Sequence, residues 1–185
     1  MHRIKFLAIA PLTLLGLSEI ALQSSSVMAH PHSNNTLQRG SQEQITVLTS
    51  SSSSLAKLNT ELLELTNAER RKAGLPPLQL SAELSQAAQL HAEDMVRNGF
   101  FSHSGSDGSK ISDRAQAAGY LYSYVGENIA AGYPTPAQTI RQWMRSSGHR
   151  RNILKPQYQE IGFGYVSDPS SPYRHYWVQV FGSPR

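Results

Sequence analysis

Three side chains that could act together are His103, Glu127 and His149, spaced along the second half of the chain. Glu127 follows Gly126 and precedes an amide and three apolar residues, a composition typical of buried segments. A carboxylate held in such surroundings needs a partner, because an unpaired buried charge is costly. The upstream and downstream histidines are candidate partners, so we expect the three segments to fold around one cleft.

Metal binding is one use of such a cluster. Two neutral imidazoles and a carboxylate suit a zinc-like ion, and three protein ligands would leave a fourth position open. His103, Glu127 and His149 are therefore the candidate ligands. The alternative is that Glu127 only pairs with His103 and ties its loop to the core. Both interpretations stay open at this point.

Hydrolysis is the alternative chemistry. A metal-bound water near Glu127 would suit it, and Ser146 or Ser147 near His149 has the residue types of a nucleophile and its base. However, these serines lie among Gly and Arg, as in a C-terminal helical turn, and no third orienting group is evident. The sequence therefore assigns no catalytic residue.

The folded part begins with a leucine pattern. Leu55, Leu58, Leu62 and Leu65 recur at spacings of three and four, which predicts an amphipathic helix. Gly74 is expected to end it, because glycine is the usual residue just past a helix C-terminus.

A second helix is predicted between Ser81, a good N-cap, and Asn98. Its apolar stripe includes His91, which we expect to be a half-buried histidine bonded to the backbone; the alternative is that it points toward a cleft. A short helix over residues 112–118 follows, and its Arg114 is expected to be exposed or paired with an acid.

A third full helix is predicted from Thr135, a capping residue that precedes proline at the first helical position. Trp143 shares its inward stripe and is expected in the core. The helix is expected to end around Ser147, which would put His149 at or just past its C-terminus.

Strands are predicted near the end of the chain. Residues 120–124 form a short extended stretch that leads into Glu127. Residues 160–166 and 176–181 alternate in polarity around a turn, which predicts a hairpin. Helices first and strands last, without alternating crossovers, predict an α+β fold with helices packed on a small antiparallel sheet.

The N-terminal part is predicted not to belong to this fold. Residues 1–29 have the basic start, apolar run and small final residues of a secretory signal, cleaved after Ala29. We expect no stable membrane anchor after cleavage and a secreted, periplasmic or extracellular protein. Residues 30–54 are polar and serine-rich, which predicts a disordered linker. Residues 55–185 then form the single domain.

Composition excludes other classes. The chain has 17 basic and 13 acidic residues, and removal of the predicted signal leaves a formal charge of +3. Its basic residues are scattered, except for the short cluster Arg70–Lys72 and the pair Arg150–Arg151. Nucleic-acid proteins concentrate their basic residues on one face, so we expect no nucleic-acid partner. There is no cysteine, which excludes disulfides and thiolate metal sites. We expect a monomer held by its own core.

Four motifs in order carry a family resemblance. Phe101–His103, Gly126–Ile129, Trp143–Leu154 and Tyr176–Gly182 are similar to the motifs of the CAP superfamily. This superfamily groups cysteine-rich secretory proteins, antigen 5 and plant pathogenesis-related proteins, and the chain most resembles its bacterial secreted branch. The resemblance covers about residues 58–182 and implies a three-layer α–β–α sandwich, the CAP or SCP domain, with a central cleft.

In eukaryotic members the cleft holds two histidines and two glutamates associated with divalent cations. The resemblance places the first histidine and the first glutamate on His103 and Glu127. The second glutamate position is Ser146 and the second histidine position is Tyr176, with His175 one place earlier and expected on the opposite face.

Half of the family's ligand set is therefore replaced. We expect no required cofactor and, at most, weak binding of a divalent cation such as zinc, with His149 as a replacement ligand. Other residues expected to line the cleft are Asn128, Ser146, Tyr176 and Gln179. We favour a binding protein whose ligand or partner is unknown over an enzyme, although the resemblance does not decide this, because the family's members share no single reaction. A metal-assisted hydrolase, either protease or esterase, and a lipid-binding protein are the alternatives.

Overall fold

The computed structural model describes the backbone of residues 34–185 and the side chains of residues 53–185. The predicted signal peptide, residues 1–29, lies outside the described residues. The chain divides into two compact units, Met1–Ser41 and Gln42–Arg185. The fold and the candidate site belong to the second unit. Within the described part, no helix combines the length and apolar character that a membrane span requires.

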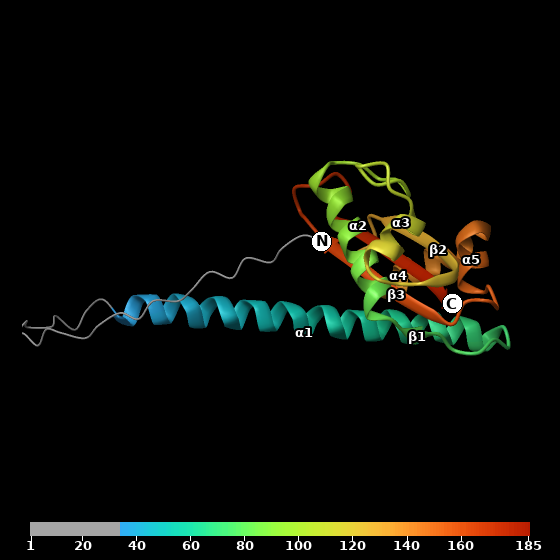
Figure 1. The fold of residues 1–185 in the computed structure, drawn as a ribbon, viewed down its shortest axis with the longest axis horizontal. Helices are drawn as coiled ribbons and strands as arrows, with labels where there is room; N and C mark the ends of the chain where they lie inside the picture. Colours follow the sequence, from blue (N-terminus) through green and yellow to red (C-terminus); the bar gives the residue numbers. More distant parts are fainter. Residues whose placement is uncertain (1–33) are drawn as a thin grey trace, which may run out of the picture. The chain divides into compact units, whose positions relative to one another are not determined.

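Helices and strands follow one another as shown in Figure 1. The elements are α1 Asn34–Lys72, β1 Gln79–Leu80, α2 Ala82–Arg97, α3 Ile111–Ala117, β2 Tyr122–Ala131, α4 Pro136–Arg145, α5 Ser147–Ile153, β3 Glu160–Ser167 and β4 His175–Pro184. The sheet has the order β1-β3-β4-β2. Its β3–β4 and β4–β2 pairs are antiparallel, and the short β1 pairs parallel to β3. The predicted hairpin is β3–β4.

The backbone of α1 begins at Asn34, within the segment predicted to be a disordered linker. Among the described side chains, burial starts at Leu55, which is half-buried, and becomes complete at Leu62. Once a helix has formed, adding a turn costs far less than nucleating one, so its backbone can continue in either direction. Where the independently folding domain begins, near Leu55, stays a prediction.

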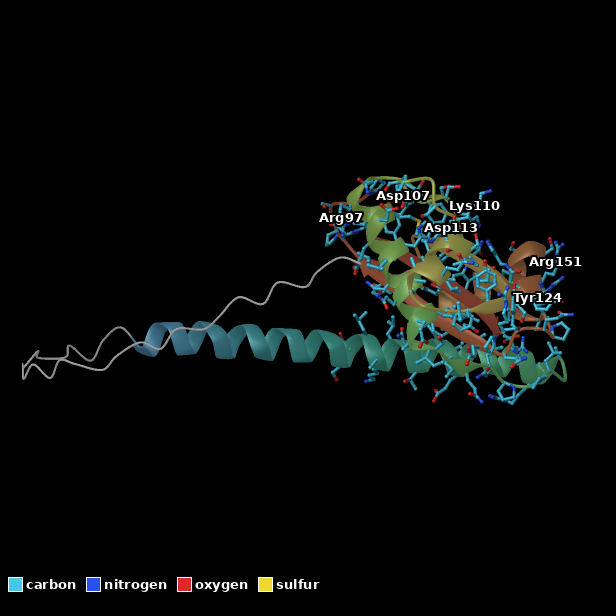
Figure 2. The ribbon with its side chains drawn as sticks, viewed as in Figure 1. Arg97, Asp107, Lys110, Asp113, Tyr124 and Arg151 are labelled. Carbon is cyan, nitrogen blue, oxygen red and sulfur yellow. The ribbon has the colours of Figure 1, made fainter. Side chains whose placement is uncertain are left out.

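One face of the sheet packs against α2 and α3. Val178 and Val180 of β4 point to this face, together with Leu84 and Ala88 of α2. Arg97 closes α2, and the loop that leads to α3 carries Asp107 and Lys110, as Figure 2 shows. The helices come close to the sheet because β3 has glycines there, and a Cβ at Gly162 would collide with the α2 backbone.

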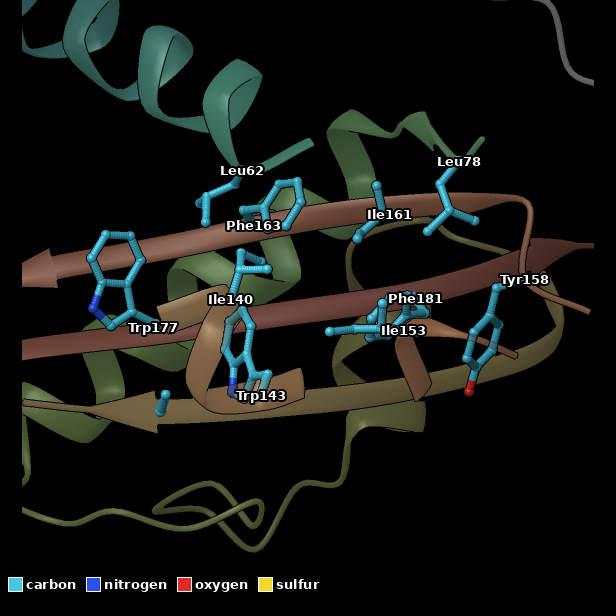
Figure 3. Packing of buried hydrophobic residues seen from close by; sticks show 11 residues of the cluster. Leu62, Leu78, Ile140, Trp143, Ile153, Tyr158, Ile161, Phe163, Trp177 and Phe181 are labelled. Atoms are coloured by element: carbon cyan, nitrogen blue, oxygen red, sulfur yellow. The ribbon is translucent and has the colours of Figure 1, made fainter. Parts of the chain in front are cut away.

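The other face of the sheet packs against α1, α4 and α5. Trp177 and Phe181 of β4 alternate with the valines of the first face and point to this side. They meet Leu62, Trp143 and Ile153 from the three helices, as Figure 3 shows. Helices on both faces of a sheet make the predicted three-layer α–β–α sandwich of the α+β class. That prediction is confirmed.

Trp143 is a core residue, as predicted from its helical stripe. Its side chain is 0% exposed. Its indole Nε1 donates a hydrogen bond to the Ile129 carbonyl at 3.1 Å. The ring therefore fixes α4 against β2 by packing and by a satisfied polar atom.

Two elements differ from the sequence prediction. The stretch expected to be extended only up to Glu127 is the ten-residue strand β2, because Ile129 pairs with Val178 of β4 and its neighbours continue the ladder. The helix expected to end near Ser147 ends at Arg145. The chain leaves helical geometry at Ser146 and resumes as α5. His149 consequently lies in the first turn of a helix and not past a helix end.

Candidate functional site

Glu127 occupies the middle of β2 and pairs in register with Val180, so its side chain points to the α2 face. The side chain is only 2% exposed. His103 Nδ1 donates to its Oε1 at 2.7 Å, and Arg114 Nη2 donates to its Oε2 at 2.7 Å. Both carboxylate oxygens therefore have a charge-assisted or polar partner, as a buried carboxylate requires.

Arg114 comes from the centre of α3, and its side chain is 10% exposed. Besides Glu127 it reaches two backbone carbonyls, donating from Nη1 to Ser109 at 2.8 Å and from Nη2 to His103 at 3.0 Å. It therefore joins the loop between α2 and α3 to the sheet. The sequence predicted an acidic partner as one possibility for Arg114 but did not identify Glu127, because the two residues belong to different elements.

His91 lies on α2 beneath this loop and is fully buried. Its Nε2 is 2.9 Å from the Ser102 carbonyl, so Nε2 carries the proton and Nδ1 is an acceptor. Among the described residues, that Nδ1 has no hydrogen-bond partner. Burial lowers the pKa of His91, an effect that the Glu127 carboxylate, 4.0 Å away, opposes. The predicted bond to the backbone is confirmed, and the burial is greater than expected.

His149 comes from α5, on the other side of β2. Burial lowers its pKa, and the nearby His103 lowers it further. Its Nδ1 is buried and has no hydrogen-bond partner within the part of the chain that the structure describes. Because β2 is an edge strand, residues from the two faces of the sheet can approach each other around it. His103 bonds Glu127 and lies near enough to His149 to lower its pKa, but among the described residues no hydrogen bond or ion pair joins the His149 side chain to Glu127. The side chain of His103 is 58% exposed.

Asn128 and Gln179 lie on the opposite face of the sheet from Glu127. They are paired across β2 and β4, and Asn128 Nδ2 donates to Gln179 Oε1 at 3.0 Å. Gln179 in turn donates from Nε2 to the Thr66 hydroxyl of α1 at 3.0 Å. Asn128 also receives a bond from Asn152 Nδ2, which donates in addition to the Glu127 carbonyl at 3.1 Å. These buried amides join the helices to the sheet and do not line a cleft with Glu127.

Ser146 and Tyr176 have separate environments. Ser146 is half-buried at the α4–α5 junction, and no hydrogen bond among the described residues joins it to His149. Tyr176 is buried, with its ring 6.5 Å from Phe101 and 5.8 Å from Tyr173 between centroids. Neither supplies a ligand at the positions where the eukaryotic pattern has one.

His175 lies on the opposite face from Tyr176, as expected from strand alternation. Its Nδ1 is 2.8 Å from the Tyr165 hydroxyl, and Tyr165 packs against the cluster that contains Trp177. It therefore cannot replace the missing histidine beside Glu127 without a change of face.

A pocket of about 320 Å³ adjoins the cluster, between α2, the 105–109 loop and α3. His91 and Arg114 belong both to its wall and to the site around Glu127. The sequence did not predict it, although His91 and Asp94 stand three residues apart on one helix face, the spacing that places two side chains side by side. Its wall is formed by Gln86, Ala87, Leu90, His91, Asp94, Arg97, Ser106, Asp107, Ser109, Arg114, Ala117 and Ala118.

Comparison with known proteins identifies the family. The sequence model of the cysteine-rich secretory protein family, CAP, matches residues 63–181. The chain belongs to the CAP superfamily. Its relative YkwD of Bacillus subtilis (strain 168), an uncharacterized protein, is 40% identical over 139 residues, or 75% of this chain and 52% of YkwD.

Solved structures agree with this assignment and with a bacterial member. An extracellular protein containing a SCP domain from Bacillus anthracis is 30% identical with a TM-score of 0.63, over 69% of this chain and 40% of that one. A cysteine-rich secretory protein from Staphylococcus aureus, 22% identical with a TM-score of 0.57 over 69% and 38%, shares the fold. This CAP chain thus spans about half or less of the length of YkwD and of these two solved proteins.

The donor set of this CAP domain does not fit a divalent cation. Among the described residues, no group of three or more His, Cys, Asp or Glu side chains is arranged to hold a metal ion. The guanidinium of Arg114 already lies 2.7 Å from Glu127 Oε2, and His103 Nδ1 donates a hydrogen bond to Oε1. A metal ion at Glu127 would have to displace a positive charge that three hydrogen-bond acceptors hold in place.

Proposed function

We propose that this CAP domain is an extracellular, non-catalytic binding module whose ligand enters the pocket beside Arg114. The observation that carries the proposal is the position of Arg114, which neutralises Glu127 and forms part of the pocket wall. The ion pair and hydrogen bonds of Glu127 then act as a support for a binding surface. Export follows from the signal-like N-terminus and is consistent with the extracellular Bacillus anthracis relative.

The same contacts argue against hydrolysis. A carboxylate acts as a general base when it can reach a water molecule or a substrate proton. Both oxygens of Glu127 are engaged by His103 and Arg114. A nucleophilic serine needs a bonded base, and Ser146 has no such bond to His149 within the described chain.

The pocket suits a small polar ligand better than an acyl chain. Its volume of about 320 Å³ is at the small end of the range typical of ligand sites. Asp94, Asp107 and Arg97 make part of its wall charged, while Ala87 and Leu90 supply a short apolar surface. A ligand with one polar group and a small apolar body would match both parts of this wall.

The proposal is tested by a substitution that fills the pocket. Ala117 is exposed and lines it, so Ala117→Trp should occupy the space without disturbing the core. Gln116→Trp is the matched control, because Gln116 is exposed on the same helix and does not line the pocket. A set of small amines, carboxylates and sugars would be screened against the mature chain by NMR. Hits should shift α2 and α3 resonances in wild type and in Gln116→Trp, and should be lost in Ala117→Trp.

Two results would contradict the proposal. Equal binding by both tryptophan variants would place the ligand elsewhere. Turnover in a panel of peptide, ester and glycoside substrates, with or without zinc, would make the domain an enzyme.

A further inference from the structure

A long segment of the chain carries positive charge and no negative charge. Between Glu127 and Glu160 there is no acidic residue, although the whole chain has 13. The same segment contains the basic residues Arg141, Arg145, Arg150, Arg151 and Lys155. It includes α4 and α5, on the opposite face of the sheet from the pocket beside Arg114.

The arginines of α4 and α5 play no part in holding the fold together. Arg141, Arg145, Arg150 and Arg151 are exposed, and no ion pair or hydrogen bond of their side chains occurs within the described part of the chain. Arg70 is the contrast, because it is buried and donates to the carbonyls of four residues of the loops around it: Pro76, Ile153, Lys155 and Tyr158. The α4 and α5 guanidinium groups therefore keep their full capacity for an external partner.

Two of these arginines line a second hollow on the surface of the protein. It has a volume of about 290 Å³ and is lined by Tyr133, Pro134, Gln138, Arg141, Gln142 and Arg145. The four α4 residues among them stand at i, i+3, i+4 and i+7, which places them along one side of the helix. The other side of α4 is fixed in the core by Ile140 and Trp143. Two guanidinium groups and two amides are thus held on a rigid helix along one concave surface.

We infer that this hollow binds phosphate groups of an extended, soluble polyanion. Guanidinium groups bind phosphate oxygens in pairs, and the amides of Gln138 and Gln142 can donate to further oxygens. Arg150 and Arg151 of α5 extend the positive surface for a chain of repeating phosphates. Neither α4 nor α5 carries an acidic residue, so the anion meets no opposing charge from these two helices.

A membrane surface is a less suitable partner. Helices that lie on bilayers place large apolar side chains into the interface. The stripe formed by Gln138, Arg141, Gln142 and Arg145 contains no apolar residue. These residues also line a concave surface, which can take up a polymer chain but cannot lie flush against the flat headgroup layer of a bilayer.

The experiment measures binding of inorganic polyphosphate of defined length to the mature chain by calorimetry and by salt titration. The variant Arg141→Gln/Arg145→Gln removes both charges from the hollow. Arg71→Gln/Arg185→Gln makes the same charge change at two exposed positions outside both this hollow and the pocket beside Arg114. We expect the first variant to weaken binding about a hundredfold and the second to change it less than about threefold, because hydrogen bonds to charged groups are worth about tenfold each.

Salt dependence gives a separate readout. The slope of log K against log salt should decrease in magnitude by about 1.4 in Arg141→Gln/Arg145→Gln, as expected for two lost contacts to a flexible anionic chain. Unchanged melting temperatures in both variants would show that the fold is intact.

Several outcomes would overturn the inference. Equal weakening in the two variants would show a response to net charge alone. Equal or tighter binding of polyglutamate of matched charge would show that phosphate is not what is recognised. Tighter binding to anionic phospholipid vesicles, or to single-stranded DNA, would assign the surface to a membrane or to a nucleic acid.

Discussion

Removal of the Arg114 guanidinium is the most direct test of the site. Arg114→Met keeps the length and the apolar stem of the side chain and removes its charge. Glu127, 2% exposed, would then be a buried carboxylate without its cation. The carbonyls of Ser109 and His103 would also lose a donor. Breaking a buried ion pair from one side typically costs about 3–5 kcal/mol.

We therefore expect Arg114→Met to lower the free energy of unfolding by about 3–5 kcal/mol in urea titrations at neutral pH. Arg97→Met is the control, because Arg97 is 72% exposed and its removal should change stability by less than about 0.5 kcal/mol. In a double-mutant cycle, Arg114→Met with Glu127→Gln should cost less than the two single changes added together, since no unpaired charge remains.

A loss below about 1 kcal/mol in Arg114→Met, well under the range for a broken buried pair, would refute this reasoning. It would mean that solvent replaces the guanidinium at Glu127. Strict additivity in the cycle would likewise show that the two side chains do not depend on each other.

Four further predictions concern the core, pH, metal and export. Trp143→Ala should cost about 3–5 kcal/mol in urea unfolding, as large core truncations do. Burial lowers the pKa of His91 and of His149, so the unfolded chain binds more protons below about pH 6.5. The contribution of these histidines to stability should be complete above that pH and should be lost as the pH falls. Melting curves at several pH values should show a smaller loss in His91→Gln/His149→Asn. Zinc should give no calorimetric heat with wild type but measurable heat with Arg114→Ala, where a carboxylate oxygen is vacated. The mature mass from the host should correspond to cleavage after Ala29.

Local patterns in the sequence predicted most of the fold. The leucine spacing from Leu55, the Ser81 cap and the Thr135–Pro136 start each describe a helix through short-range periodicity. Alternation predicted the β3–β4 hairpin. The extent of β2 was missed because Ile129 and its apolar neighbours fit a buried helix as well as a strand, and only pairing with β4 decides between them.

The site was harder to predict, because its contacts cross elements. The pair of His103 and Glu127 was among the expectations, but the partner Arg114 was not. Its long side chain has several possible targets, and the packing of α3 against β2 selects one. Asn128 was expected beside Glu127 in the cleft, yet adjacent residues of a strand point to opposite faces. Once β2 is a strand through Glu127, Asn128 must face α1, α4 and α5.

The bond from Asn152 to the Glu127 carbonyl bears on self-association. β2 is the outer strand on its side of the sheet, and an outer strand presents backbone groups on which another strand could grow. Asn152 of α5 occupies one of these carbonyls in the middle of β2. The inward-facing carboxylate of Glu127 adds a charge that a strand-by-strand stack would have to accommodate. Both features make this edge a poorer template for the addition of another strand.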